Sequence, residues 1–125
     1  MMIKELLLVG LGGGIGSIFR FLVTFLTGKL PLTSTFPLAT FIANVSGCFL
    51  IGLLIGLSAR YGFLDKQLKL LLITGFCGGY TTFSAFSLEN IRLLETHQYA
   101  TAALYITASL LAGLSSVALG VFLSK

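Results

Sequence analysis

Four long apolar stretches limit what this chain can fold into more than any other feature of its sequence. They cover approximately residues 6–27, 37–60, 70–94 and 99–123. A helix needs about 20 apolar residues to cross a bilayer, and helices are one of only two structures that satisfy all their backbone hydrogen bonds in lipid. Only 10% of the 125 residues are charged, far fewer than in a soluble domain. The sequence therefore predicts an all-α membrane protein in which residues 1–125 form one domain of four transmembrane helices.

The positions of lysine and arginine predict how these helices are oriented. With four helices, both termini lie on the same side of the membrane. Outside the predicted helices or at their ends, the side of the termini carries five basic residues and the opposite side carries two: Lys4, Arg60, Lys66, Lys69 and Lys125, against Lys29 and Arg92. Because basic residues are enriched on the cytoplasmic side, we expect the termini to face the cytoplasm. The bias is mild, so the pattern also allows insertion in both orientations.

The third apolar stretch contains a segment that disfavours a continuous helix. Residues 75–87 are Gly-Phe-Cys-Gly-Gly-Tyr-Thr-Thr-Phe-Ser-Ala-Phe-Ser. Adjacent glycines weaken a helix, and backbone carbonyls that are freed inside a membrane must find other partners. Broken helices at that depth line cavities or bind ions. We therefore predict that the third helix is broken within the membrane and that the protein takes part in transport.

Small and polar residues recur at helical spacing in three of the four stretches. Two pairs of glycines have the G-x-x-x-G spacing that lets helices approach closely in lipid: Gly12 with Gly16, and Gly52 with Gly56. Two further sets each share one helix face: Thr40, Asn44 and Gly47, and Thr101, Tyr105, Ser109 and Gly113. We expect these two faces to meet each other or to line a water-filled crevice. Ordinary hydrogen bonding would account for the hydroxyl groups alone.

Two polar side chains are costly to place inside a membrane, and each has two interpretations. The amide of Asn44 has donors and an acceptor to satisfy, so it either bonds a neighbouring helix or donates to a permeating anion. Arg20 lies about 12 Å inside the predicted end of its helix. It is either an arginine that snorkels to the interface near a misplaced helix end, or a cation in a water-filled vestibule that attracts anions.

Two aromatic residues follow the glycine–threonine segment. Phe83 and Phe86 are three positions apart, a spacing that normally marks a packing face. An aromatic ring also has a positive edge, and ring edges beside amide and hydroxyl donors would hold a small dehydrated anion without trapping it. Conduction requires such weak, repeated sites.

Three segments of the sequence resemble the Fluc/CrcB family of fluoride channels. They are residues 12–21 (Gly-Gly-Gly-Ile-Gly-Ser-Ile-Phe-Arg-Phe), 43–47 (Ala-Asn-Val-Ser-Gly) and 75–89 (Gly-Phe-Cys-Gly-Gly-Tyr-Thr-Thr-Phe-Ser-Ala-Phe-Ser-Leu-Glu). The third segment is the most specific of the three. The resemblance covers essentially the whole chain, including its length and its number of predicted spans. Tyr105 and Ser109 fall where the family has a tyrosine and a serine.

The resemblance implies an antiparallel, dual-topology homodimer with two separate fluoride pores along the interface between the protomers. By analogy, the ring edges of Phe83 and Phe86 line each pore. Hydrogen-bond donors would line the polar side of the pore: Asn44, Thr82, Tyr105, Ser109 and Thr40.

The resemblance also implies charged groups and an ion outside the pore walls. Arg20 matches the arginine of the family's vestibule. The backbone carbonyls of Gly78 and Thr81 from both protomers would surround one central structural Na⁺. Glu89 matches a carboxylate further along the pore, to which we assign no role here. Ala85 stands where the family often has a threonine, so one hydroxyl is missing beside the second ring.

The expected function is passive export of fluoride by a multi-pass protein of the bacterial plasma (inner) membrane, whose partners are a second copy of itself, fluoride and lipid, and no nucleic acid. The sequence shows no nucleophile, acid–base pair or metal cluster, so we predict that the protein is not an enzyme. Cys48 and Cys77 are interpreted as small apolar residues.

Two other classes of protein stay open. A small multidrug-resistance exporter has a similar length, but its coupling chemistry needs a carboxylate deep in the first span, where this chain has Arg20. A membrane assembly protein without transport activity, such as a holin-like pore former or a membrane chaperone, would explain the glycine packing. It would not explain a glycine–threonine segment followed by paired rings.

Overall fold

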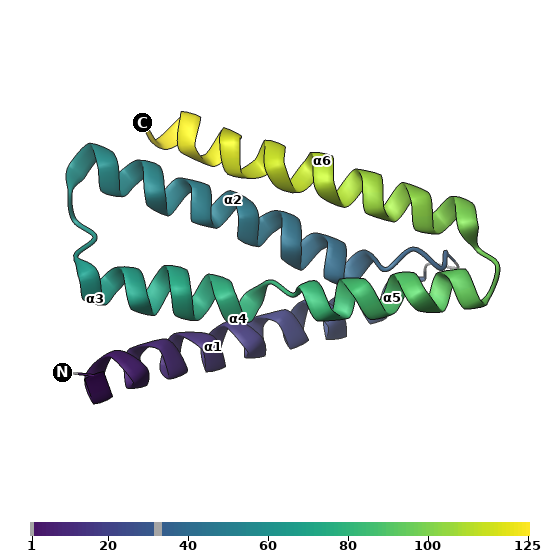
Figure 1. Ribbon diagram of the computed structural model, residues 1–125, viewed down its shortest axis with the longest axis horizontal. Helices are drawn as coiled ribbons and strands as arrows, with labels where there is room; N and C mark the ends of the chain where they lie inside the picture. The colour runs from purple at the N-terminus through teal and green to yellow at the C-terminus, as the bar shows by residue number, and fades with distance from the viewer. Residues whose placement is uncertain (1, 32–33) are drawn as a thin grey trace.

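The computed structural model describes residues 2–31 and 34–125, and all of the regular structure in these residues is helical. In chain order the elements are α1 (Met2–Gly28), α2 (Leu38–Tyr61), α3 (Lys66–Lys69), η1 (Leu70–Cys77), α4 (Gly78–Tyr80), α5 (Phe83–Glu95) and α6 (Tyr99–Ser124). Figure 1 shows them running back and forth along the molecule, with both termini at one end. By length and composition, α1, α2, the segment from α3 to α5, and α6 can each cross a membrane. This confirms the predicted class, a multi-pass helical membrane protein with four spans.

The helices extend slightly beyond the apolar stretches because the polar residues at their edges also adopt helical backbone. The third segment, for example, begins at Lys66 rather than at residue 70. Its start is marked by Asp65, whose carboxylate accepts a hydrogen bond from the backbone N–H of Leu68 at 2.8 Å, a standard N-cap. At the other end of the preceding loop, α2 stops because Gly62 adopts a left-handed conformation (φ 66°) and donates its N–H to the carbonyl of Ser58.

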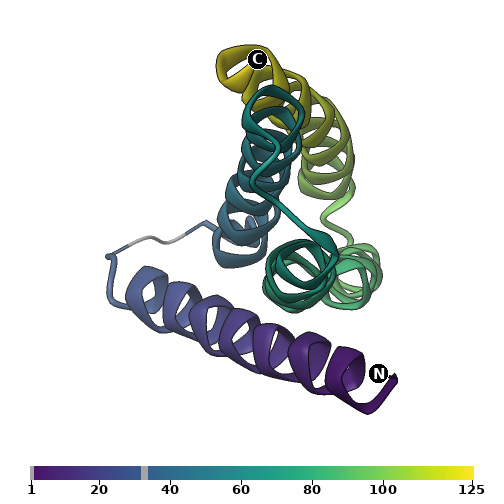
Figure 2. The same ribbon diagram turned by 90° about the vertical axis from the view of Figure 1, so that its left-hand side faces the viewer.

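The third segment lies between two groups of helices. On one side α2 and α6 form the most extensive helix pair of the molecule, and on the other side α1 packs against η1 and α4. Figure 2 shows this order, with α1 crossing the bundle at an angle to the α2–α6 pair. The central position of the third segment means that its backbone can be contacted from both sides.

Glycines stand where the helices come closest. A Cβ atom placed on Gly16 would lie 2.8 Å from the backbone nitrogen of Tyr80, and one on Gly12 would overlap the backbone of η1. On the other side of the molecule, Cβ atoms on Gly52 and Gly56 would overlap atoms of α6. Each predicted G-x-x-x-G pair therefore marks a helix–helix contact, as expected where helices associate by close packing and not by the hydrophobic effect.

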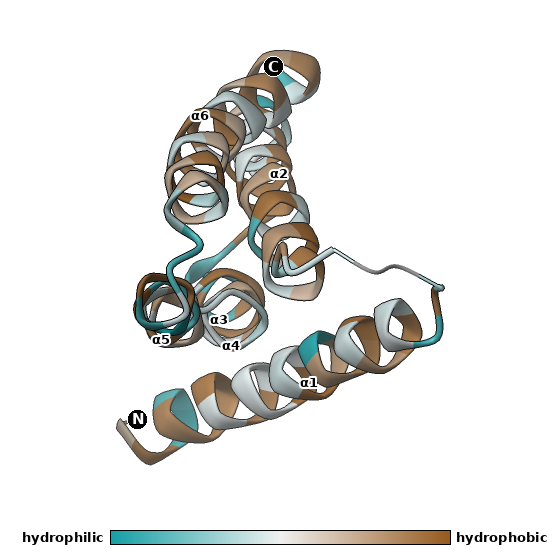
Figure 3. Cartoon of the chain, turned by 90° about the vertical axis from the view of Figure 1, so that its right-hand side faces the viewer, coloured by the Kyte–Doolittle hydropathy of each residue, from teal (hydrophilic) through white to brown (hydrophobic). Residues whose placement is uncertain are grey.

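Apolar residues are spread along all four spans and around them. Figure 3 shows apolar colours over most of the helix length, with polar colours concentrated at the turns and along α5. Few large side chains are buried within the protomer, and the main cluster of buried residues is formed by Leu93, Ala102 and Tyr105. Phe21 and Phe122 are examples of large apolar side chains that face outward. Such a surface suits a lipid environment, in which apolar atoms need no cover from water.

Candidate functional site

The third membrane-length segment is not one regular helix. After the short α3, η1 is π-helical, and at its end the N–H of Gly78 still contacts the carbonyl of Ile73, five residues earlier. After the short α4, Thr81 (φ −87°, ψ 158°) and Thr82 (φ −151°, ψ 123°) have extended backbones, and α5 begins at Phe83. The non-helical residues are therefore the two threonines, whereas the sequence pattern indicated the glycine pair.

The glycines and the threonines serve different purposes in this segment. A Cβ atom on Gly79 would lie 2.8 Å from the Cα atom of Gly13, so glycine is needed there for the close contact with α1. Threonine suits an extended residue because its branched side chain favours the β region. The hydroxyl of Thr82 also caps α5 by accepting a hydrogen bond from the N–H of Ala85 at 3.2 Å.

Asn44 of α2 holds the extended residue in place. Its Oδ1 accepts a hydrogen bond from the N–H of Thr82 at 2.7 Å, and its Nδ2 donates to the carbonyl of Thr82 at 3.0 Å. The amide thus pairs with both backbone groups of one residue, as a neighbouring β-strand would. This is the structural interpretation that the sequence left open. A side-chain amide carries two N–H groups, so one of them remains for another acceptor.

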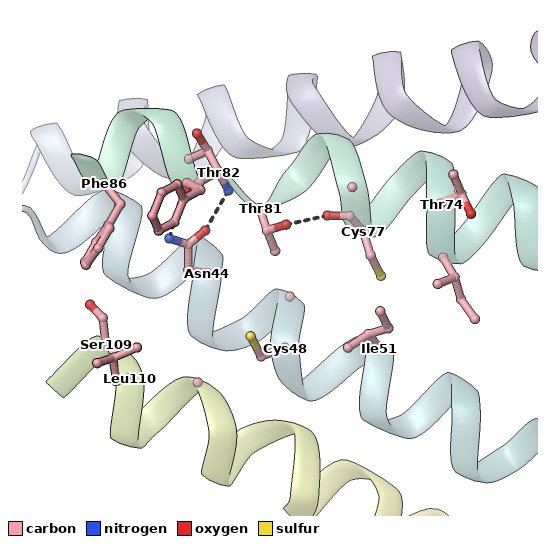
Figure 4. Close-up of a pocket in the computed structure, with 15 residues that line it drawn as sticks. Asn44, Cys48, Ile51, Thr74, Cys77, Thr81, Thr82, Phe86, Ser109 and Leu110 are labelled. Atoms are coloured by element: carbon pink, nitrogen blue, oxygen red, sulfur yellow. Dashed lines mark hydrogen bonds between the residues drawn. The ribbon is translucent and has the colours of Figure 1, made fainter. Parts of the chain in front are cut away.

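A groove of about 430 Å³ lies beside the two threonines. Figure 4 shows that α2, the interrupted segment and α6 each supply side chains to it. It brings together five of the predicted pore residues: Asn44, Thr82, Phe83, Phe86 and Ser109. Gly47 and Gly113 also line it, so the two polar faces predicted on the second and fourth helices share this groove.

The two phenylalanines stand at one end of the groove. Their ring centroids are 5.8 Å apart, and the ring planes are inclined by 38°. Phe86 packs against Tyr105, with centroids 4.9 Å apart. Phe83, in contrast, is 79% exposed in the single protomer. One ring is therefore packed within the chain, and the other is open for contact with something outside it.

Two further predicted pore residues converge on Glu89. The hydroxyl of Thr40 donates to one carboxylate oxygen at 2.7 Å, and that of Tyr105 donates to the other at 2.8 Å. Glu89 lies three residues after Phe86 on α5, so the cluster of Thr40, Tyr105 and Glu89 lies about one helical turn beyond the two rings. Both hydroxyl protons are committed to the carboxylate and are not directed into the groove.

Two buried side-chain atoms in the described part of the chain have no hydrogen-bond partner: the Oγ of Ser109 and the Oδ1 of Asn90. Because Ser109 lines the groove, its hydroxyl is free to donate to a ligand there. Asn90 is 7% exposed and donates to the carbonyl of Phe86 at 2.9 Å. Asn90 was not among the predicted site residues, although its position four residues after Phe86 puts it on the same helix face as the rings.

The side chain of Arg20 is bound to the interrupted segment. Its Nε–H donates to the carbonyl of Gly79 at 3.2 Å, and the hydroxyl of Ser17, one turn earlier on α1, lies 3.5 Å from the same oxygen. The residue is half-buried. A snorkelling arginine would instead extend toward the headgroups, so this bond does not match the snorkelling interpretation.

The two predicted cation ligands, Gly78 and Thr81, both line the groove. None of the hydrogen bonds within residues 2–31 and 34–125 ends on the carbonyl oxygen of either residue. The same residues contain no group of three or more His, Cys, Asp or Glu side chains that would hold a metal. Cys48 and Cys77 are free thiols, as the sequence indicated.

Comparison with known proteins places the whole chain in one family. A family model described as "CrcB-like protein, Camphor Resistance (CrcB)" matches residues 7–121. A protein of Azobacteroides pseudotrichonymphae named "Fluoride-specific ion channel FluC" is 49% identical over 99% of this chain and 98% of its own length. Proteins of the same name from Flavobacterium psychrophilum and Methylobacillus flagellatus are 48% and 45% identical, over 98% and 97% of this chain and 98% and 94% of their own lengths.

Proposed function

This chain belongs to the CrcB family, and we propose that it is a channel through which fluoride leaves the cell passively. The full-length relatives carry the name of a fluoride-specific ion channel. Because they are ion channels, the prediction that the chain is not an enzyme is confirmed. The four spans and the glycine packing suit a membrane channel but do not identify the ion, so the argument for fluoride has to come from the groove.

One observation carries the proposal: the groove at the interruption joins uncommitted hydrogen-bond donors to aromatic rings. The buried hydroxyl of Ser109 has no partner, and Asn44 retains one N–H beyond its bond to Thr82. Fluoride is small and strongly hydrated, so donors must replace its water at every step. The ring edges of Phe83 and Phe86 add partial positive charge. None of the described lining residues is Lys or Arg, so no cationic side chain in the groove would trap the ion.

The same features favour fluoride over chloride. Chloride is larger, and it would not fit a narrow track in which donors and ring edges surround the ion closely. Beyond the rings, the carboxylate of Glu89 holds the hydroxyls of Thr40 and Tyr105. These hydroxyls would join the track if they turned from the carboxylate to the ion. The small multidrug-resistance class is disfavoured because the full-length relatives of this chain are named as fluoride-specific ion channels and not as drug exporters.

We propose that two copies, inserted antiparallel, enclose two such tracks. The groove lies at the surface of the single protomer, and the ring of Phe83 is 79% exposed there. Polar backbone groups that line an open groove would be unsatisfied in lipid, so a second copy of the chain is a suitable cover. The protein would lie in the bacterial inner membrane, and the mild excess of basic residues on the side of the termini permits both orientations.

A structural Na⁺ between the two copies fits the residues present. The carbonyl oxygens of Gly78 and Thr81 have no hydrogen-bond donor within the described residues, and hard cations prefer oxygen ligands of this kind. Such an ion would supply positive charge that satisfies these carbonyls at membrane depth. Because it would bind only the assembled dimer, it would also stabilise that state.

Efflux from liposomes loaded with fluoride or chloride tests the proposal. We expect rapid loss of fluoride and little loss of chloride from vesicles that contain the purified protein. Phe83→Ile and Phe86→Ile should each slow fluoride efflux by about tenfold or more, because isoleucine fills space without a polar ring edge. Phe122→Ile is the matched control, since that ring is exposed and does not line the groove.

The same assay separates the alternatives. An exporter coupled to protons would require a pH gradient, whereas the proposed channel transports fluoride without one. A membrane assembly protein would give no fluoride efflux above that of empty vesicles. Unchanged efflux after both ring substitutions would refute the assignment of the rings to the pore.

A further inference from the structure

The two ends of the interruption are held by different neighbours. Asn44 of α2 pairs with both backbone groups of Thr82, which precedes α5. Arg20 of α1 donates to the carbonyl of Gly79, which lies in α4 before the extended residues. The two helices that flank the third segment therefore each contribute one side chain to its backbone. From the sequence, Asn44 was expected either to bond a neighbouring helix or to donate to an anion, and Arg20 either to snorkel or to attract anions in a vestibule. A bond from Arg20 to the backbone of this segment was not predicted.

The carbonyl groups at the end of α4 divide into two sets. In a continuous helix each would accept the N–H of the residue four positions later. Here the N–H of Thr82 bonds Asn44 and that of Ala85 bonds the hydroxyl of Thr82, so the carbonyls of Gly78 and Thr81 lose these partners. The carbonyl of Cys77 accepts both the N–H and the hydroxyl of Thr81, at 3.0 and 2.8 Å. The carbonyl of Gly79 accepts from Arg20. Those of Gly78 and Thr81 accept no hydrogen bond from the described residues, and both residues line the groove.

The contact between α1 and α4 around Gly79 is close. A Cβ atom on Gly79 would lie 2.8 Å from the Cα of Gly13, and one on Gly16 would lie 2.8 Å from the nitrogen of Tyr80. Backbone therefore lies directly on backbone, and Arg20 follows Gly16 by one turn on α1. The bond is made by Nε, which is close to the aliphatic stem, and not by the terminal nitrogens. The group that contacts the carbonyl of Gly79 is therefore the Nε–H donor of Arg20.

We propose that Arg20 is a positioning residue for the ion site of the interrupted segment. By holding the carbonyl of Gly79 on the side of α1, it fixes the end of α4 so that the carbonyls of Gly78 and Thr81 face the groove. This inference rests on the proposed channel function and its bound Na⁺. It differs from attraction of anions by the arginine, because it depends on one N–H donor and on the sodium ion.

A set of three substitutions separates the donor from the charge. In Arg20→Gln, the side-chain nitrogen is as many bonds from Cα as Nε is in arginine, so the donor remains and the charge is lost. Arg20→Met removes both, and Arg20→Lys retains the charge. The measurements are fluoride efflux and the melting temperature of the full-length protein in detergent, each as a function of Na⁺ concentration, with N-methyl-D-glucamine as the replacement cation.

For Arg20→Gln we expect the Na⁺ concentration at half-maximal stabilisation and half-maximal efflux to stay within about threefold of the original protein. For Arg20→Met it should rise by about tenfold or more, the effect of one lost hydrogen bond from a charged donor. This rise should be the same at low and high ionic strength, because a directional contact is not screened as a distant charge is. Efflux at saturating Na⁺ should largely recover.

Other results would overturn the inference. If Arg20→Gln is as defective as Arg20→Met while Arg20→Lys is normal, and high salt removes the difference, the arginine acts through its charge. If Arg20→Met does not fold, Arg20→Gln decides: a normal Na⁺ response supports the inference, and a failure to fold contradicts it. Fluoride efflux that does not depend on Na⁺ at any concentration would show that the channel works without the proposed Na⁺, and would refute the inference. A Na⁺ dependence that Arg20→Met leaves unchanged would refute only the role of Arg20.

Discussion

The α2–α6 pair and the interrupted third segment show two different ways of building a membrane protein. In α2 and α6 every residue from Leu38 to Tyr61 and from Tyr99 to Ser124 is helical, so the backbone satisfies its own hydrogen bonds. The pair needs only small residues at the contact, such as Gly52 and Gly120. In the third segment the helix stops at Tyr80 and resumes at Phe83, so the backbone depends on side chains from α1 and α2.

This difference explains where polar residues are found. A regular helix pair in lipid gains stability from close packing, and its backbone offers no free donor or acceptor to a ligand. An interrupted segment exposes carbonyl and amide groups that must be bound by something. Asn44 and Arg20 bind some of them. The carbonyls of Gly78 and Thr81, two residues that line the groove, accept no hydrogen bond from the described residues. The polar side chains that stabilise the interruption therefore also determine which backbone groups are left for ions.

Asn44→Ala should have the largest effect of the substitutions considered for these two regions. It leaves the N–H and the carbonyl of Thr82 without partners, and we expect the free energy of unfolding to fall by about 2–4 kcal/mol and fluoride efflux to be lost. Thermal unfolding in detergent and vesicle efflux measure the two effects. Ser58→Ala is the control, since that residue lies on the same helix and does not line the groove. A stable, active Asn44→Ala protein would show that the interruption supports itself.

Gly120→Ala tests the regular pair. The added Cβ would lie 2.8 Å from the backbone nitrogen of Leu53, and we expect overpacking to cost about 1–3 kcal/mol. Because Gly120 does not line the groove, the ratio of fluoride to chloride efflux should not change. Gly10→Ala is the matched control, since nothing lies within 4 Å of its added Cβ. Equal melting temperatures for the two variants would contradict the close contact between α2 and α6.

Tyr105→Phe should have a smaller effect. It removes one hydrogen bond to Glu89 and keeps the ring that packs against Phe86, so the expected loss is about 1 kcal/mol of stability and about threefold in efflux. Thr40→Val removes the other bond to the same carboxylate. Because both hydroxyls share one acceptor, the double variant should deviate from the sum of the single effects. Strict additivity would show that the two bonds act independently.

Asn90→Leu should have the smallest effect. The amide donates only within its own helix, to the carbonyl of Phe86, and its Oδ1 is buried without a partner. Removing a buried group that lacks a partner offsets the loss of its other bond, so we expect stability to change by less than about 1 kcal/mol. Fluoride efflux should be close to that of the original protein. A strong loss of efflux would instead place Asn90 on the path of the ion.

The sequence allowed the helices to be predicted well and the contacts less well. The four spans were found because long apolar stretches have few alternative structures in lipid. The groove residues Asn44, Phe83, Phe86 and Ser109 were identified from their spacing and the family resemblance. The interruption lies within the predicted segment, residues 75–87, but the sequence pattern attributed it to the glycines. In a single sequence, a glycine needed for the close approach of Gly79 to α1 cannot be distinguished from one that weakens the helix.

The roles of Glu89, Asn90 and Arg20 required the folded chain. Thr40 meets Glu89 across 49 positions of sequence, and Arg20 meets Gly79 across 59. No local pattern encodes such pairs. They depend on how far each helix is displaced along its neighbour, since a shift of one residue moves a side chain about 1.5 Å along the helix axis and turns it by a quarter of a turn or more.

By itself, the sequence determined that this chain forms four transmembrane helices and that faces rich in glycine bring these helices together. It also determined that the third helix contains residues unsuited to an unbroken helix. Apolar length and small-residue spacing are local properties, and lipid leaves a peptide few other choices. Only the tertiary structure decided which carbonyl and amide groups are bound by neighbouring helices and which remain open. The reason is physical: the partners of these backbone groups are side chains of other helices, and they come within hydrogen-bonding distance only when the helices pack together.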